Sequence, residues 1–249
     1  MNRNAGAGTW VRRARPLLGT IVEVAALAEL PAADEAVNAA FDAVAEVQAQ
    51  LSRFEATSEI TRFHALPCGA SMAIGQHAQR VLAAAQALRD DTGGLFDISL
   101  GTACDGWRCD GHLLHKLSAN VRFDLGGIAK GYAVDVAVEA LLAAGSIAGW
   151  VNAGGDIRVF GDTELPISLR DEHRGGVRPF ANLRNGAFAT SHFDHATRSR
   201  TSAATPVNAH VSVAAPSCMG ADALTKVVAI SGDTAHPLLA RYGAQAWIH

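Results

Sequence analysis

The sequence predicts a mixed α/β fold, of the α+β kind, with mixed sheets packed by helices. Apolar residues at helical spacing alternate along the chain with short apolar runs typical of strands. The 249 residues are 49% hydrophobic and 18% charged, which is the balance of a globular chain with a buried core. No repeat and no compositional break divides them. We therefore expect a single domain over residues 15–249, preceded by a flexible tail over residues 1–14.

The first half of the chain is predicted to contain one strand and two long helices. Ile21–Val24 is a short apolar run that predicts a strand. Pro31–Leu51 is predicted to be a helix because its apolar residues recur every three or four positions. Ser58, or its neighbour Thr57, is suited to cap a short helical turn. His77–Asp90 is rich in alanine and predicts a second helix, which ends before a pair of glycines.

The second half is predicted to alternate strands and helices more closely. A third helix is expected over Ile128–Ala144, with Gly145 at its end. Residues 161–186 are rich in Arg, Gly, Pro and Asn, and they predict loops or a hairpin. The remaining expected elements are the strands Trp150–Asn152, Ile157–Phe160, Ala187–Thr190, His210–Val213 and Ala246–Ile248, a helix over Ala221–Ile230, and a short helix before the last strand.

Charge and hydropathy argue against several classes of protein. The net charge is −3 and no basic stripe dominates, which argues against a nucleic-acid-binding protein. No apolar run approaches the roughly 18 residues that a membrane span needs. The N-terminal segment lacks the apolar core of a signal peptide, so we expect a cytoplasmic protein. Arginines at positions 3, 12, 13 and 15 indicate a mobile basic tail.

Cysteine and histidine spacing offers little support for a metal centre. The four cysteines show no CxxC motif, and we expect reduced thiols, with a metal site or cross-link at Cys104 and Cys109 as the alternative. His112 and His115 lack a second ligand pair, which indicates a surface loop rather than a zinc site. Residues 105–110 are expected to form a loop as well.

The segment Asp124–Asp135 concentrates the most chemistry in the chain. Two adjacent glycines, Gly126 and Gly127, allow the backbone to approach a ligand closely. The helix that follows would direct bare N–H groups and the positive end of its dipole at a phosphate, with Lys130 adding a charge. The alternative is a glycine-rich helix start with a solvated lysine. No GxxxxGK[ST] pattern is present, so this is not a Walker loop.

Several short segments together carry a resemblance to a known family. Each of them alone has an alternative interpretation as turn or cap chemistry. In order they are Leu18–Thr20, Leu51–Phe54 with Ser58–Ile60, Thr92–Asp97, Asp124–Asp135, Val151–Asp156, Ala189–Ser191 and Ala221–Thr225. Together and in this order they resemble the FAD:protein FMN transferase (ApbE-type) family, from about residue 15 to residue 230.

The resemblance implies an activity. Members of that family bind FAD as substrate and cleave its pyrophosphate with a magnesium ion. They transfer FMN to a threonine or serine of an acceptor flavoprotein and release AMP. The resemblance therefore implies FAD and an acceptor flavoprotein as partners and Mg²⁺ as cofactor. Two rival functions remain: an FAD pyrophosphatase that uses water, and a flavin-binding or flavin-delivery protein without turnover.

The resemblance also assigns roles to individual residues, in three groups. The positions that match catalytic candidates are His192 and Asp194, either of which would act as general base. The positions that match cofactor contacts are Leu18, Phe54, Leu95, Phe96, Asp97, Asp124, Lys130 and Phe193. The positions that match metal ligands are the backbone carbonyl of Gly127 and the side chains of Asp222 and Thr225.

Two departures from the family pattern affect these assignments. The family continues after Thr190-Ser191 with a glycine, a hairpin and a His-Ile-Ile-Asp-Pro-x-Thr-Gly motif. Here His192 follows at once, and the segment is either that motif with the hairpin deleted or a polar loop. The family also has a threonine four residues after its metal-binding aspartate, where this chain has Lys226. Lys226 either replaces part of the metal's charge or abolishes a ligand, and Thr225 lies one residue early.

Overall fold

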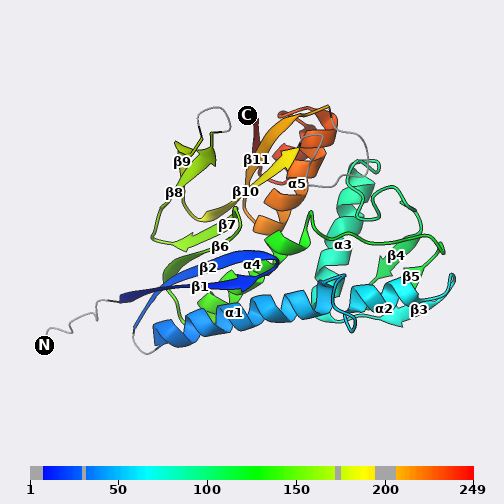
Figure 1. Ribbon diagram of the computed structural model, residues 1–249, viewed down its shortest axis with the longest axis horizontal. Helices are drawn as coiled ribbons and strands as arrows, with labels where there is room; N and C mark the ends of the chain where they lie inside the picture. Colours follow the sequence, from blue (N-terminus) through cyan, green and yellow to red (C-terminus); the bar gives the residue numbers. More distant parts are fainter. Residues whose placement is uncertain (1–7, 30–31, 172–174, 194–205) are drawn as a thin grey trace, which may run out of the picture.

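The computed structural model describes residues 8–29, 32–171, 175–193 and 206–249. Its main sheet has the strand order β1-β2-β6-β7-β10-β11-β12, and every neighbouring pair is antiparallel. The strands of this sheet are β1 (Thr9–Leu17), β2 (Thr20–Ala28), β6 (Ala148–Ala153), β7 (Asp156–Gly161), β10 (Gly186–Phe193), β11 (Ala209–Ala215) and β12 (Gln245–Ile248). The mixed α/β fold is therefore confirmed (Figure 1).

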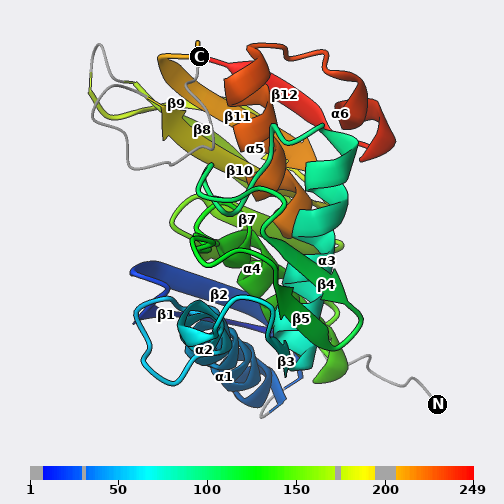
Figure 2. The same cartoon turned by 90° about the vertical axis from the view of Figure 1, so that its right-hand side faces the viewer.

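Three helices form the layer that packs against this sheet. They are α1 (Ala32–Leu51), α4 (Ala129–Ala143) and α5 (Cys218–Ser231), with α4 in contact with both of the others. Each follows its sequence prediction closely, although α5 begins three residues earlier than expected. Helix α4 buries residues around its whole circumference, because it lies between α1, α5 and strands β6 and β7 (Figure 2).

Two smaller sheets flank this core. The first has the order β3-β5-β4 and is formed by β3 (Ser71–Ala73), β4 (Trp107–Asp110) and β5 (Leu113–Lys116). It lies beside α2 (Glu59–Ala65) and α3 (Gln76–Asp91), on the right of Figure 1. The second is the hairpin of β8 (Leu165–Arg170) and β9 (Val177–Leu183), within the stretch where loops or a hairpin were expected. A short helix, α6 (Pro237–Arg241), precedes β12.

The structure corrects two sequence predictions. The expected flexible tail extends too far, because residues from Thr9 onward pair along the whole of β2. Two of its arginines form ion pairs there, Arg12 with Glu23 and Arg13 with Asp34. The expected loop around Trp107 is also wrong, because strands β4 and β5 form a hairpin there with the Trp107 side chain buried beneath it.

Two further findings concern the four cysteines and the possibility of a membrane-spanning helix. All four cysteines are free, as expected, with Cys68 exposed and Cys109 and Cys218 buried. Among the described helices, none combines the length and the apolar character needed to cross a bilayer.

A buried carboxylate joins α4 to the start of α5. Oδ1 of Asp135 accepts the backbone N–H of Cys218 at 2.9 Å, and Oδ2 accepts that of Met219 at 2.9 Å. Arg158 on β7 donates to the same carboxylate at 2.7 Å. Because the first N–H groups of a helix have no partner within it, Asp135 supplies acceptors that α5 itself lacks. This connection places the first turn of α5, and with it Asp222, against α4.

His64 makes the stability of the fold depend on pH. The backbone N–H of Phe123 donates to Nε2 of His64 at 2.7 Å, so the ring must be neutral at that nitrogen. Burial lowers the pKa of His64 from 6.5 to about 4, and the charges of Arg122, Lys116 and Arg53 act in the same direction. The unfolded chain therefore binds a proton that the folded chain does not. The stability that depends on a neutral His64 is therefore fully present above pH 6.5 and is lost as the pH drops towards 4.

Between pH 7.5 and pH 4.5 we expect the wild type to lose roughly 1–2 kcal/mol more than a variant without this histidine, a figure reduced because His64 is only half-buried. The measurement is urea unfolding at both pH values, compared with His64→Gln, which keeps an acceptor and does not titrate. An equal loss in both proteins would show that another group causes the pH dependence.

Candidate functional site

A cavity of about 1680 Å³ opens between the β1–β2 turn, the start of α4, the β8–β9 hairpin and the ends of β10 and β11. It is larger than most small-molecule sites, as an extended dinucleotide would require. Most of the residues matched to family positions line it together, although they come from distant parts of the sequence. These are Leu18, Phe54, Leu95, Phe96, Asp97, Asp124, Gly127, Lys130, His192 and Asp222.

Two of the predicted residues that the structure describes, Phe193 and Thr225, do not line this cavity. Phe193 is fully buried in the hydrophobic core, so its ring faces protein rather than ligand. Thr225 is also fully buried, and its hydroxyl donates to the backbone carbonyl of Asp222 at 2.7 Å and bonds Ser191 Oγ at 2.9 Å. Asp194 lies outside the described residues. His192 and Phe193 complete strand β10, so the segment directly after Ser191 is strand rather than loop.

The glycine-rich start of α4 differs from the anion site expected there. The N–H of Gly126 donates to Oδ1 of Asp124 at 2.9 Å, and those of Ile128 and Ala129 donate to the carbonyl of Leu125. Three of the N–H groups expected to be bare are therefore paired within the loop, which Asp124 organises. The alternative of a solvated Lys130 is also wrong, because this lysine forms a short ion pair with a buried carboxylate.

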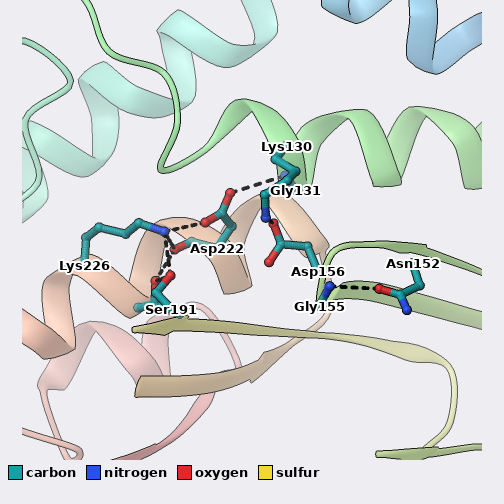
Figure 3. Close-up of polar contacts among 9 residues, drawn as sticks. Lys130, Gly131, Asn152, Gly155, Asp156, Ser191, Asp222 and Lys226 are labelled. Carbon is teal, nitrogen blue, oxygen red and sulfur yellow. Dashed lines mark hydrogen bonds and ion pairs between the residues drawn. The ribbon is translucent and has the colours of Figure 1, made fainter. Parts of the chain in front are cut away.

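That carboxylate belongs to Asp156, at the start of β7. The turn before it needs glycines, because Gly154 and Gly155 both have positive φ, at 62° and 103°. The Asp156 side chain is 1% exposed and binds Lys130 (Figure 3). Burial raises the pKa of Asp156 to about 6, together with repulsion from Asp222 and against the attraction of the nearby lysines. For Lys130, burial is outweighed by the two carboxylates, which hold its pKa above the usual range.

A second lysine–aspartate pair lies beside the first, on α5. Nζ of Lys226 donates to Oδ1 of Asp222 at 2.5 Å, to the backbone carbonyl of Asp222 at 3.1 Å, and to Oγ of Ser191 at 3.0 Å (Figure 3). Oδ2 of Asp222 accepts the N–H of Gly131 at 3.3 Å. Burial opposes the charge on Asp222, but Lys226 and Lys130 outweigh it and lower the pKa of this carboxyl.

The surroundings of Asp222 do not fit the magnesium ion that the resemblance implies. Both oxygens of its carboxylate already accept hydrogen bonds, one of them from an ammonium group. The hydroxyl of Thr225 bonds protein groups, and the Lys226 side chain packs against Gly127. Within the described ranges, no cluster of three His, Cys, Asp or Glu side chains is arranged to hold a metal. Of the oxygens predicted to bind the metal, the Asp222 carboxylate binds the ammonium group of Lys226 instead.

The rim of the cavity carries an exposed aromatic ring. The side chain of Phe54 is 84% exposed, although it is large and apolar. The guanidinium of Arg53 lies 4.7 Å from the centre of this ring and forms an ion pair with Asp124 at 3.3 Å. An exposed ring held at a cavity mouth offers a face on which a planar ligand can stack.

Asp97, by contrast, holds its own loop. Its carboxylate accepts the backbone N–H groups of Ser99 at 2.8 Å and Gly101 at 3.0 Å, and the hydroxyl of Ser99 at 2.7 Å. These bonds fix the loop after α3, which contributes Leu95 and Phe96 to the cavity wall. Asp97 therefore shapes the site through the loop as well as lining it.

Sequence reasoning missed three residues that the structure brings to the site. Asp156 and Ser191 lie in segments that were singled out, but neither was assigned a role. The third is His210 on β11, whose ring stacks on that of His192 with 4.1 Å between centroids. His249 continues this stack at 5.6 Å from His210. These histidines are brought together by the pairing of their strands, which cannot be read from the sequence.

Comparison with solved structures shows which fold this is. The structure superposes on the flavinyl transferase ApbE of Pseudomonas stutzeri in its apo form, with a TM-score of 0.81 and 22% identity, over 98% of this chain and 92% of that one. The ApbE protein of Thermotoga maritima gives a TM-score of 0.82 at 21% identity, over 96% and 94% of the two chains. At these identities the likeness establishes the fold alone.

Sequence comparison adds a relative and a family. An FAD:protein FMN transferase of Rhodobacter capsulatus is 35% identical over 138 residues, which are 48% of this chain and 26% of that protein. The chain thus matches about a quarter of the length of this curated relative. The model of the ApbE family matches residues 18–117 and 108–248, which is nearly the whole chain. The chain therefore belongs to the ApbE family.

Proposed function

We propose that this chain cleaves FAD and transfers its FMN half to a threonine or serine hydroxyl of an acceptor flavoprotein, releasing AMP. The observation that carries the proposal is the large cavity in which residues from the matched family positions gather. The relative from Rhodobacter capsulatus, named an FAD:protein FMN transferase, supports it as well.

The reaction is a phosphoryl-type transfer in which the acceptor oxygen attacks the phosphorus atom of the FMN half. A new P–O bond forms to the acceptor, and the bond from that phosphorus to the bridging oxygen breaks. AMP leaves with the bridging oxygen, and the hydroxyl proton passes to a base. His192 lines the cavity and is the proposed base, with Asp194 as the other sequence candidate. Catalysis of this kind rests on positioning and on electrostatic stabilisation of the phosphates.

The cavity divides into an apolar part and a charged part. Leu18, Phe54 and Phe96 provide apolar and aromatic surface for the flavin ring. Lys130 and Lys226 provide the positive charge in the cavity wall near the start of α4, where the pyrophosphate would lie. No step is assigned to magnesium, because the Lys226 ammonium group stands among the predicted ligands.

The experiment is to measure AMP release from FAD with and without an acceptor flavoprotein that carries a threonine target. A matched acceptor with that threonine changed to alanine is the control. Release that requires the threonine, together with flavin covalently bound to the acceptor, is the expected result. Release without any acceptor would identify a pyrophosphatase, and FAD binding without release would identify a flavin-binding protein.

Replacing Phe54 with alanine tests the placement of the flavin. We expect FAD to bind about fivefold more weakly, because an aromatic stacking contact contributes on the order of 1 kcal/mol. The fold should be unaffected, since the ring is almost fully exposed. Quenching of flavin fluorescence on titration measures the affinity. Leu142→Ala, at a half-exposed apolar position on α4 outside the cavity lining, is the control. Equal affinities in the two variants would remove Phe54 from the binding site.

A further inference from the structure

Lys226 contacts two of the three residues that the resemblance matches to metal ligands. Of the three predicted ligands, Asp222 binds its ammonium group directly and Gly127 packs against its side chain. A methyl group added at Gly127 would lie 2.9 Å from Cε of Lys226, so the glycine leaves room for the lysine. Thr225 bonds Ser191, which itself accepts from Lys226.

The contacts of the Lys226 ammonium group resemble a cation site. An ammonium group has three N–H donors, and three oxygens accept from Nζ here: a hydroxyl, a backbone carbonyl and a carboxylate. Neutral and anionic oxygens of these kinds are also the ligands of Mg²⁺. The oxygen set is thus satisfied by a cation that is covalently part of the chain.

The Lys226 ammonium group and the Asp222 carboxylate are held together because both side chains are buried. The Lys226 side chain is 7% exposed, and the carboxylate it binds is 2% exposed. Removing the ammonium group from the oxygens would leave Asp222 a buried charge without its cation. A divalent cation placed among the same oxygens would stand next to a like charge in a poorly screened interior. The lysine and the metal therefore compete for one position.

We propose that the Lys226 ammonium group takes the place of the divalent cation, so that this chain acts on FAD without magnesium. This inference rests on the function proposed above, and it assigns to Lys226 the charge that faces the pyrophosphate. Both Lys226 and Lys130 line the cavity, so their positive charge reaches a phosphate bound there. No proton or electron needs to be exchanged by Lys226 for this electrostatic role.

Metal binding is tested directly, independently of turnover. Mn²⁺, observed by electron paramagnetic resonance, is titrated into the wild type and into Lys226→Thr, each with and without FAD, with FAD alone as a blank. The introduced threonine removes the competing charge and adds an oxygen one helical turn from Asp222. We expect no Mn²⁺ bound to the wild type beyond the blank and one Mn²⁺ bound to Lys226→Thr. One Mn²⁺ bound to the wild-type protein would overturn the inference.

The second experiment measures FMN transfer in the presence of a metal chelator. FMN transfer by the wild type is expected to change less than twofold when EDTA replaces Mg²⁺. Lys226→Thr should transfer FMN with Mg²⁺ and lose at least tenfold in EDTA. Lys226→Met, which removes the charge and adds no ligand, should be slow in both. Wild-type transfer that stops in EDTA and returns with Mg²⁺ would overturn the inference. If no protein transfers FMN, the proposed function fails, whereas the Mn²⁺ titration still decides the role of Lys226.

Discussion

Replacing Lys130 with methionine is expected to slow FAD turnover by about 100-fold or more and to destabilise the fold by about 3–5 kcal/mol at pH 8. The first effect follows because Lys130 supplies charge to the cavity wall at the start of α4. The second follows because Asp156, which is 1% exposed, would keep a buried charge without its closest cation. Steady-state AMP release and urea unfolding measure the two effects.

The pH dependence of this variant distinguishes lost charge pairing from lost packing. The pKa of Asp156 is raised by burial to about 6 even with Lys130 present, and it should rise further without it. The carboxyl group of the variant would therefore be protonated at pH 5.5, and the destabilisation should be smaller there than at pH 8. The double variant Lys130→Met/Asp156→Asn should recover stability but not turnover. A loss that is the same at both pH values would show that the cause is packing.

Replacing Asp135 with asparagine is expected to destabilise the protein by about 3 kcal/mol, within the range for breaking a buried charged network. The carboxylate accepts two N–H groups at the start of α5 and the guanidinium of Arg158. An amide of the same shape keeps one acceptor oxygen and turns an NH₂ group towards donors. Turnover should fall too, because Asp222 directly follows the first turn of α5. Urea unfolding measures the first effect and AMP release the second.

Arg158→Met is the matched control for this network. The Arg158 side chain is 27% exposed, and its loss leaves both N–H bonds of Asp135 in place. We expect it to cost about 1 kcal/mol, clearly less than Asp135→Asn. If the two variants were equally unstable, the ion pair rather than the helix cap would be the stabilising contact.

Much of the fold could be predicted because helix periodicity and glycine stops are local signals. Helices α1, α3 and α4 fall within a residue or two of their predicted bounds. Strand β1 was not predicted, because it lies at the edge of the sheet and Val11 is its only buried residue. Its arginines therefore gave the segment the composition of a basic tail. Strands β4 and β5 were not predicted, because each is only four residues long and includes polar side chains. Their identity as strands comes from pairing, which is a tertiary property.

The sequence predicted the segments that form the site, but fewer of the contacts between their side chains. The glycine-rich start of α4 and the departure at Lys226 were both visible in the sequence. The partners of the two lysines were not, because Asp156 and Ser191 lie 26 and 35 residues away from them along the chain. The strand order brings β7 and β10 together beside α5 and so creates these contacts. Local pattern alone therefore could not reveal that the expected metal position holds an ammonium group.

The transfer of FMN can be tested directly by following the two phosphates of FAD separately. FAD labelled in the phosphate of the FMN half, and FAD labelled in the phosphate of the AMP half, are each incubated with the protein and a threonine-bearing acceptor flavoprotein. We expect the first label to become covalently attached to the acceptor threonine and the second to leave with AMP. Attachment of both labels, or of neither while FAD remains intact, would contradict the proposed transfer.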